Sequence, residues 1–347
     1  MKAGMDHEQA EKEAVRDMGD PVETGISLDS IHRPQAAWKL LGIIIFISIA
    51  GVLIHAGISG KASENAVAGS DRYVFHVMIG LAVMMILYLL DYTVLAKFSK
   101  IIAAVLLSAC LLVILEGGQV NGARIFISLP GGRRGMDVQK LMLFYVPIYG
   151  AILYKYHGWG YKGLVRAILW LIAPVILVYS LPALRTACVM LVTMLTMLTI
   201  TIKKDWFTVR KKRTICGIWA VFLTAPIAAF LDMYLRNRLA EYQIARIQAM
   251  FSSGSETDYL TKMLHSLWRQ NKLIGKSKSD VTGILPAFNA DYILTYLSSV
   301  YGIIAAILLC CVLAVLIFAI FNTALRQKNQ LGMMMGCGCG IVFLISF

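Results

Sequence analysis

Long apolar runs constrain this 347-residue chain more than any other feature. A helix that crosses the hydrocarbon core of a bilayer needs about 20 predominantly apolar residues. The chain is 58% hydrophobic and has a mean hydropathy of +0.70, which is far too apolar for a soluble domain of this size. We therefore predict an all-α, polytopic membrane protein with about nine transmembrane helices, at residues 38–58, 73–92, 98–116, 139–154, 163–181, 184–202, 213–235, 291–321 and 330–347.

Basic residues in the short connections between these runs indicate the orientation of the chain. Cytosolic connections of membrane proteins are enriched in Lys and Arg. If the helices alternate in direction, the basic connections fall on one side, with Lys97, Lys100, Lys155, Lys162, Arg166, Lys203, Lys204, Arg210, Lys211, Lys212, Arg213, Arg326 and Lys328. This predicts a cytosolic N-terminus, and it places 59–72, 117–138, 182–183 and 236–290 outside.

The predicted organisation is an acidic cytosolic tail, residues 1–36, followed by a single membrane domain, residues 37–347. The tail has no basic segment followed by an apolar core, so we expect no cleaved signal peptide. The formal net charge of +13 reflects the cytosolic connections and contact with anionic membrane lipids. Nucleic acid is not an expected partner.

The long polar segment before the eighth run, residues 236–290, is the predicted catalytic loop. Within it, 258–273 places Leu260, Met263, Leu264 and Trp268 at helical spacing, which predicts an amphipathic helix lying on the membrane. The loop is cationic and ends beside Asp291. A cationic loop that delivers one carboxylate to a membrane surface indicates chemistry on an anionic, lipid-borne substrate.

Ionisable groups at the mouths of spanning helices are costly to place there and are candidates for function. Asp291 is either a general base near a sugar hydroxyl or the N-cap of the next helix. Asp137 and Lys140, three residues apart, are either a charged pair lining a cavity or an interfacial pair. The candidates for binding phosphate groups, or else lipid headgroups, are Arg124, Arg185 and Arg246.

The seven cysteines show no zinc-binding spacing, and their number is odd. We therefore expect neither a metal site nor a disulfide framework from them. The six histidines are scattered along the chain, and no Ser-His-Asp or Cys-His arrangement can be proposed.

These segments resemble the SEDS family (shape, elongation, division and sporulation), which includes RodA, FtsW and SpoVE. The family's Tyr-Gln-x-x-Arg-Ile segment resembles Tyr242 to Ile247, and its Phe-Gly-Lys-Gly resembles Ile274 to Ser277. Its Gly-Ala-Arg matches Gly122 to Arg124, and the acid and Lys of its next helix start match Asp137 and Lys140. The outer turn at 181–187 and Leu285 to Tyr292 resemble two further family motifs.

The resemblance implies a peptidoglycan glycosyltransferase in the bacterial cytoplasmic membrane that polymerises lipid II into glycan strands. It implies a class B penicillin-binding protein as partner and Asp291 as the catalytic residue. Arg124, Lys140, Arg185, Arg246 and Lys276 would then bind the substrate, with Asp137 fixing Lys140. The cofactor is left open; a divalent cation (Mg²⁺ or Mn²⁺) held by Asp291 is one alternative.

The chain also departs from the family pattern. Family members carry a further helix, whereas this chain stops at Phe347 inside the ninth run, so we expect a divergent member that lacks the last helix. Three small residues of the ninth run, Gly336, Gly338 and Gly340, would then lack their usual partner. A non-catalytic scaffold for cell-wall enzymes and a lipid-linked-sugar flippase remain alternative functions.

Overall fold

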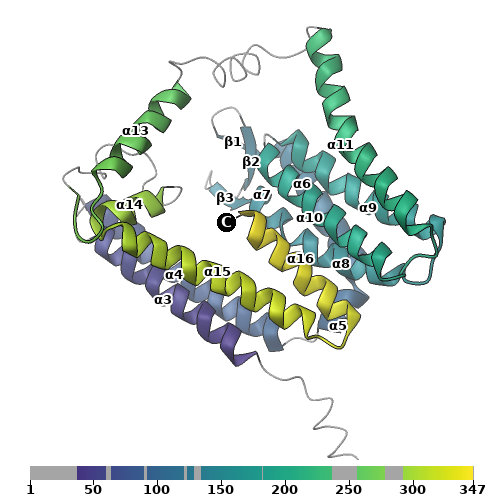
Figure 1. Ribbon diagram of the computed structural model, residues 1–347, viewed down its shortest axis with the longest axis horizontal. Helices are drawn as coiled ribbons and strands as arrows, with labels where there is room; N and C mark the ends of the chain where they lie inside the picture. Colours follow the sequence, from purple (N-terminus) through teal and green to yellow (C-terminus); the bar gives the residue numbers. More distant parts are fainter. Residues whose placement is uncertain are drawn as a thin grey trace, which may run out of the picture. The chain divides into compact units, whose positions relative to one another are not determined.

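The computed structural model describes residues 37–59, 64–89, 92–120, 123–128, 134–181, 183–236, 256–277 and 292–346 (Figure 1). By compactness the chain divides into Met1–Leu41 and Gly42–Phe347. The second unit holds all the packing described below. The acidic tail, 1–36, lies outside the described residues, so its boundary at residue 36 stays a prediction.

The predicted runs form helices, which confirms the all-α membrane architecture. The helices are α3 Trp38–Ser59, α4 Glu64–Leu89, α5 Tyr92–Lys97, α6 Ser99–Glu116, α7 Val138–Met142, α8 Tyr145–Lys155, α9 Tyr161–Ser180, α10 Leu184–Lys203, α11 Lys211–Leu235, α13 Glu256–Gln270, α14 Ile293–Val300, α15 Ile303–Leu325 and α16 Gln330–Ser346. Within the described ranges, five of them are long and apolar enough to cross a membrane: α3, α6, α9, α10 and α15.

Two predicted runs are each divided into two helices. The run at 139–154 becomes α7 and α8, separated by a turn at residues 143–144. With 11 residues, α8 is about 16 Å long, roughly half the hydrocarbon thickness. The run at 291–321 is divided at Gly302, whose φ of 104° ends α14 before α15 begins.

A small β-sheet, which the sequence did not predict, occupies the 117–138 connection. Strands β1 Gly118–Val120, β2 Ala123–Ser128 and β3 Arg134–Asp137 pair antiparallel in the order β1-β2-β3. Strand β2 contacts α6 and α7. The sheet therefore lies against α6 and α7.

Helix α8 lies at the centre of the bundle and packs against α6, α9, α10 and α16 (Figure 1). It is apolar all round, as expected for a helix enclosed by others, and residues such as Tyr145, Tyr149 and Ile152 are fully buried. The Tyr145 hydroxyl donates a hydrogen bond to the carbonyl oxygen of Trp170 in α9, at 2.8 Å. Pro174, four residues later, has no N–H for that carbonyl, so Tyr145 satisfies it.

The glycines of α16 have packing partners within the described bundle, while the expectation about a further helix stays a prediction. A Cβ at Gly336 would lie 2.8 Å from the Ala324 Cβ of α15, and one at Gly338 would lie 2.8 Å from the Met197 sulfur of α10. Small residues let membrane helices approach closely. Here they let α16 pack against α8, α10 and α15 within the described bundle.

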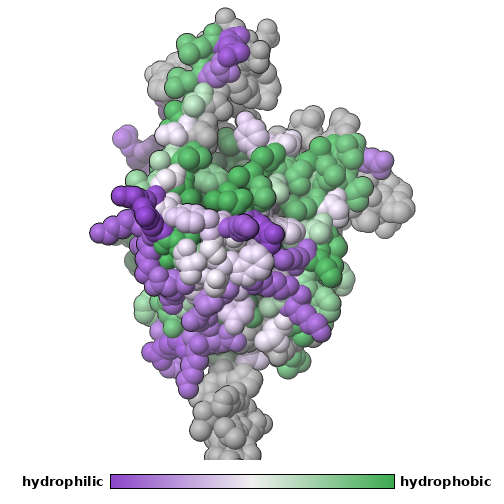
Figure 2. All heavy atoms as spheres, turned by 90° about the vertical axis from the view of Figure 1, so that its right-hand side faces the viewer, coloured by the Kyte–Doolittle hydropathy of each residue, from purple (hydrophilic) through white to green (hydrophobic). Residues whose placement is uncertain are grey.

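Apolar side chains also cover much of the molecular surface. Exposed examples include Phe46 on α3, Leu112 on α6 and Phe318 on α15. Figure 2 shows hydrophobic residues beside a region where hydrophilic and paler residues gather. Such apolar surface on long helices is suited to contact with lipid chains.

Candidate functional site

Strands β2 and β3 bring two of the predicted site positions near each other. In the antiparallel register Phe126 pairs with Asp137, and Ser128 pairs with Arg134. Arg124 is two residues before Phe126 on β2, about 7 Å along the strand. The backbone of Arg124 and the start of α7 therefore lie in one small module.

Asp137 acts as the N-cap of α7. Its Oδ1 accepts a hydrogen bond from the backbone N–H of Gln139 at 2.9 Å. The expected ion pair between Asp137 and Lys140 is not formed in the described part of the chain, where the ion pairs include Lys211–Asp205 and Arg236–Asp232. Asp137 therefore fixes the start of α7, and Lys140 is exposed in its last turn.

Arg185, in the first turn of α10, is bonded to the other end of the chain. Its Nη2 donates to the carbonyl oxygen of Ser346, at the end of α16, over 3.5 Å. A cation next to the last carbonyls of a helix is favourable because they carry partial negative charge. The exposed guanidinium keeps further donors for a ligand.

These residues gather at one end of the bundle. Helix α6 runs into the sheet, β2 contacts α7, α7 contacts α9, and α10 begins beside the end of α16. Asp137, Lys140 and Arg185 thus come from distant parts of the sequence to the same end.

A second group of contacts, which we call the loop-base network, joins residues 271–277 to residues 298–304. The Asn271 side-chain amide donates to Ser298 Oγ at 2.9 Å, and Ser299 Oγ donates to Asn271 Oδ1 at 3.0 Å. Four backbone hydrogen bonds accompany this pair: Gly275 N to Tyr301 O (3.1 Å), Ser277 N to Ser299 O (2.7 Å), Ile303 N to Lys272 O (3.1 Å) and Ile304 N to Leu273 O (3.3 Å).

Gly302 is the sterically critical residue of the loop-base network. Its φ of 104° is a conformation that residues with a Cβ rarely adopt. A Cβ there would also lie 2.5 Å from the carbonyl oxygen of Leu273. Glycine at this position therefore lets the 271–277 segment approach the turn between α14 and α15.

Lys276 is held within this network. Its two neighbours, Gly275 and Ser277, donate their backbone N–H groups to Tyr301 and Ser299, and the Lys276 side chain is exposed. Helix α14 is eight residues long, about 12 Å, and it begins directly after Asp291 and Tyr292. The network therefore holds the backbone on either side of Lys276 against the C-terminal end of α14.

Asp291 and Arg246 lie outside the described residues, so their predicted roles stay predictions. The N-cap of α14 is Tyr292, which makes no side-chain capping bond. No group of three or more metal-ligating side chains occurs among the described residues. The Mg²⁺ or Mn²⁺ alternative depends on Asp291 and stays untested.

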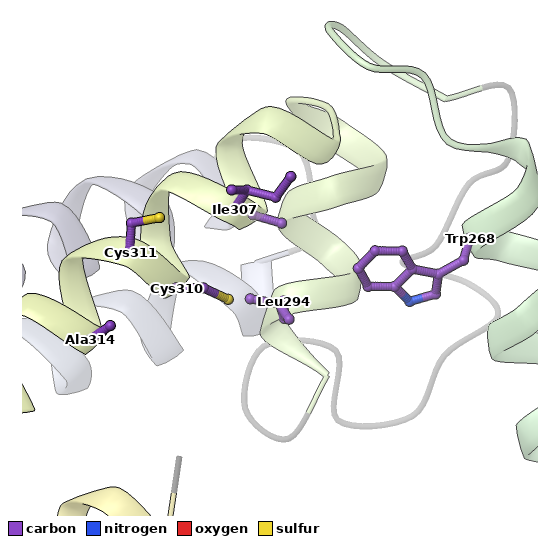
Figure 3. Close-up of a pocket in the computed structure, with 7 residues that line it drawn as sticks. Trp268, Leu294, Ile307, Cys310, Cys311 and Ala314 are labelled. Atoms are coloured by element: carbon purple, nitrogen blue, oxygen red, sulfur yellow. The ribbon is translucent and has the colours of Figure 1, made fainter.

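Helix α13, at Glu256–Gln270, confirms the amphipathic helix predicted at 258–273. Its buried Leu267 packs with Met263, Leu264 and Tyr292, the residue after Asp291. Trp268 of α13 points toward Leu294 of α14 and lines an apolar groove of about 330 Å³ with Ala306, Ile307, Cys310, Cys311 and Ala314 of α15 (Figure 3). The groove offers apolar contacts where α13 faces α14 and α15.

Residues 32–347 match the family described as cell cycle protein, FtsW/RodA/SpoVE. The chain belongs to this family. It is 24% identical over 351 residues to a probable peptidoglycan glycosyltransferase FtsW of Aliivibrio salmonicida, covering 95% of this chain and 83% of that protein.

Two solved structures resemble the FtsW/RodA/SpoVE fold of this chain. One is a chain from a peptidoglycan synthase complex that coordinates polymerization and crosslinking. Its TM-score is 0.67 and its sequence identity is 16%, and the match covers 88% of this chain and 83% of that one. The other is RodA of Thermus thermophilus, with a TM-score of 0.57, 15% identity, and coverage of 88% and 80%. At these identities the likeness concerns the fold.

Asn271, Ser298, Ser299 and Gly302 are not among the site residues that the sequence motifs predict. The sequence does mark three of these positions as unusual, since Ser298, Ser299 and Gly302 interrupt an otherwise apolar run. The pairing of Ser298 with Asn271, however, joins positions 27 residues apart and has no periodic pattern.

Proposed function

We propose that this protein is a peptidoglycan glycosyltransferase that polymerises lipid II into glycan strands. The observation that carries the proposal is the match of residues 32–347 to the FtsW/RodA/SpoVE family, together with the name of the Aliivibrio salmonicida relative. The loop-base network supports it, because that network holds the C-terminal end of α14, the helix that follows Asp291 in the sequence.

In the proposed reaction Asp291 acts as general base. A hydroxyl oxygen of the acceptor sugar attacks the anomeric carbon of the donor, and the bond from that carbon to the diphosphate oxygen breaks. Asp291 accepts the hydroxyl proton, and the lipid diphosphate leaves. A divalent cation held by Asp291 is the alternative means of activating the hydroxyl.

Cationic side chains would stabilise the negative charge on the departing diphosphate. The candidates are Arg124, Lys140, Arg185, Arg246 and Lys276. Asp137 contributes indirectly, because its capping bond fixes the helix that carries Lys140. The apolar groove beside Trp268 offers a surface for a hydrocarbon chain at the exit of the catalytic loop.

The proposed location is the bacterial cytoplasmic membrane, with the N-terminus in the cytosol. Basic connections at residues 97–100, 155–166, 203–213 and 326–328 favour the cytosol for their end of the bundle. The sheet and the start of α10 then face outward. A class B penicillin-binding protein is the proposed partner, since one similar chain comes from a complex that concerns polymerization and crosslinking.

The test is glycan synthesis by the purified chain in detergent micelles supplied with lipid II, with and without the candidate penicillin-binding protein. We expect glycan strands that lengthen with time on a gel. A folded protein that yields no strands under either condition would contradict the proposal and favour the non-catalytic scaffold.

A further inference from the structure

Three lysines lie close together at the basic end of the bundle, where α5 and α6 meet the end of α8. Lys155 Nζ donates a hydrogen bond to the backbone carbonyl of Lys97 at 2.8 Å. Lys100 Nζ lies 4.9 Å from the ring centroid of Tyr156, the residue after Lys155. All three lysines are exposed, and we call them the lysine cluster.

The lysine cluster concentrates positive charge without a partner acid among the described residues. The described ion pairs, Lys211–Asp205 and Arg236–Asp232, involve none of its members. Lys155 follows the predicted run at 139–154, and its pKa is lowered by partial burial and then by the positive charge of Lys100. Like charges held together raise the free energy of the protein, and a bound anion would relieve this cost.

The backbone beneath the lysine cluster is firmly packed. Ala96 of α5 is buried with Ala151 of α8 and Leu331 of α16. Ser99, between two of the lysines, is fully buried, and its Oγ has no hydrogen-bond partner. The lysine cluster thus stands on a packed backbone, and its exposed Nζ groups, rather than the buried Ser99 hydroxyl, are the donors available to phosphate oxygens.

Apolar side chains continue from the lysine cluster along α6. Phe98, Ile101 and Val105 recur at helical spacing and are 44%, 61% and 59% exposed. Cations at the end of an exposed apolar strip match a molecule with an anionic head and hydrocarbon chains. A soluble phosphate or an acidic protein segment would leave the strip unused.

We propose that the lysine cluster binds the phosphate of an anionic phospholipid whose acyl chains lie along Phe98, Ile101 and Val105. With the proposed orientation, this lipid belongs to the cytosolic leaflet. The site is at the opposite end of α6 from the sheet and the candidate catalytic residues. It is therefore separate from the proposed site of glycan synthesis.

Native mass spectrometry of the full chain tests this proposal with phosphatidylglycerol titrated against phosphatidylcholine. The test variant carries Lys97→Gln, Lys100→Gln and Lys155→Gln. The matched control carries Lys211→Gln, Lys212→Gln and Arg213→Gln, which removes the same charge from another basic segment. We expect phosphatidylglycerol binding to fall at least roughly tenfold in the test variant and to change less than about threefold in the control.

A single substitution tests the same site in case the triple variant does not fold. Lys100→Gln alone removes no described hydrogen bond and should still weaken binding, whereas Lys100→Arg should retain it.

An equal loss in both triple variants would overturn the proposal in favour of diffuse charge attraction, as would equal binding of the two lipids. Competition by glycerol 3-phosphate at the lipid's concentration would indicate a soluble ligand instead, and displacement by polyglutamate would indicate an acidic protein. Binding is measured without glycan synthesis, so its outcome is independent of the proposed enzyme activity.

Discussion

The side-chain amide of Asn271 donates a hydrogen bond to the hydroxyl of Ser298, and through this contact α13 and α14 are joined. Asn271 follows α13, and Ser298 lies in the second half of α14. Because α14 begins directly after Asp291 and Tyr292 in the sequence, this hydrogen bond holds the helix that follows the proposed catalytic base.

Asn271→Ala should lower glycan synthesis, because the variant lacks the hydrogen bond that holds α14 against the segment after α13. The substitution removes hydrogen bonds to Ser298 and Ser299, which should cost about 1–3 kcal/mol of local stability. A displacement of the loop by about 1 Å would lower kcat on the order of 10–100-fold. Steady-state kinetics and hydrogen exchange across α14 measure the two effects.

The control for Asn271 is Ser266→Ala, which removes an exposed hydroxyl that bonds only within α13. It should retain near-normal kinetics and exchange. Unchanged kcat and unchanged exchange in Asn271→Ala would show that the network does not position the loop.

Substitutions of Asp137 separate capping from a need for charge. If the carboxylate serves only as the N-cap of α7, then Asp137→Asn should retain most activity, because Asn caps a helix as well as Asp. Asp137→Ala should lose about 1 kcal/mol of stability and a larger share of activity. Thermal unfolding and glycan synthesis measured on both variants decide between the roles; equal inactivation by both would show that the charge itself is required.

The Tyr145 hydroxyl is predicted to stabilise the bundle because it satisfies the Trp170 carbonyl opposite Pro174. Tyr145→Phe should destabilise the protein by about 1–3 kcal/mol. Adding Pro174→Ala supplies the missing backbone N–H, so the double variant should lose less than the single one. The measurement is a double-mutant cycle of thermal or denaturant unfolding in one detergent.

Tyr149→Phe is the matched control for Tyr145. The Tyr149 hydroxyl donates to the Ala167 carbonyl at 3.2 Å, but a backbone N–H of α9 also reaches that carbonyl. Loss of the Tyr149 hydroxyl should therefore lower the free energy of unfolding by less than loss of the Tyr145 hydroxyl. Equal costs for the two phenylalanine variants, or an absence of rescue by Pro174→Ala, would contradict this explanation.

Much of the fold is predictable from hydrophobic run length, because each long helix satisfies its own backbone hydrogen bonds inside a membrane. The runs that became α9, α10 and α16 were located to within a few residues. Run length does not reveal where a run breaks. The break at Gly302 depends on the close approach of Leu273, and the sheet at 118–137 depends on pairing between short strands.

The charged residues of the candidate site could be predicted from the sequence, but their hydrogen-bond partners could not. Its charged members, such as Lys140 and Arg185, stand out because charges are rare beside spanning helices. Their partners do not, since Arg185 bonds to a backbone carbonyl 161 residues away and Asp137 bonds to a backbone N–H. Backbone partners carry no sequence signal, so the role of Asp137 as a cap rather than an ion-pair partner emerged only from the fold.

The most direct test of the central claim is lipid II polymerisation by the Asp291→Asn variant beside the unaltered protein. The amide is close in size to the carboxylate but is not a base at neutral pH, so we expect glycan strands to disappear while thermal stability and partner binding stay unchanged. Glycan synthesis at the unaltered rate by the folded variant would contradict the assignment of Asp291 as the catalytic base.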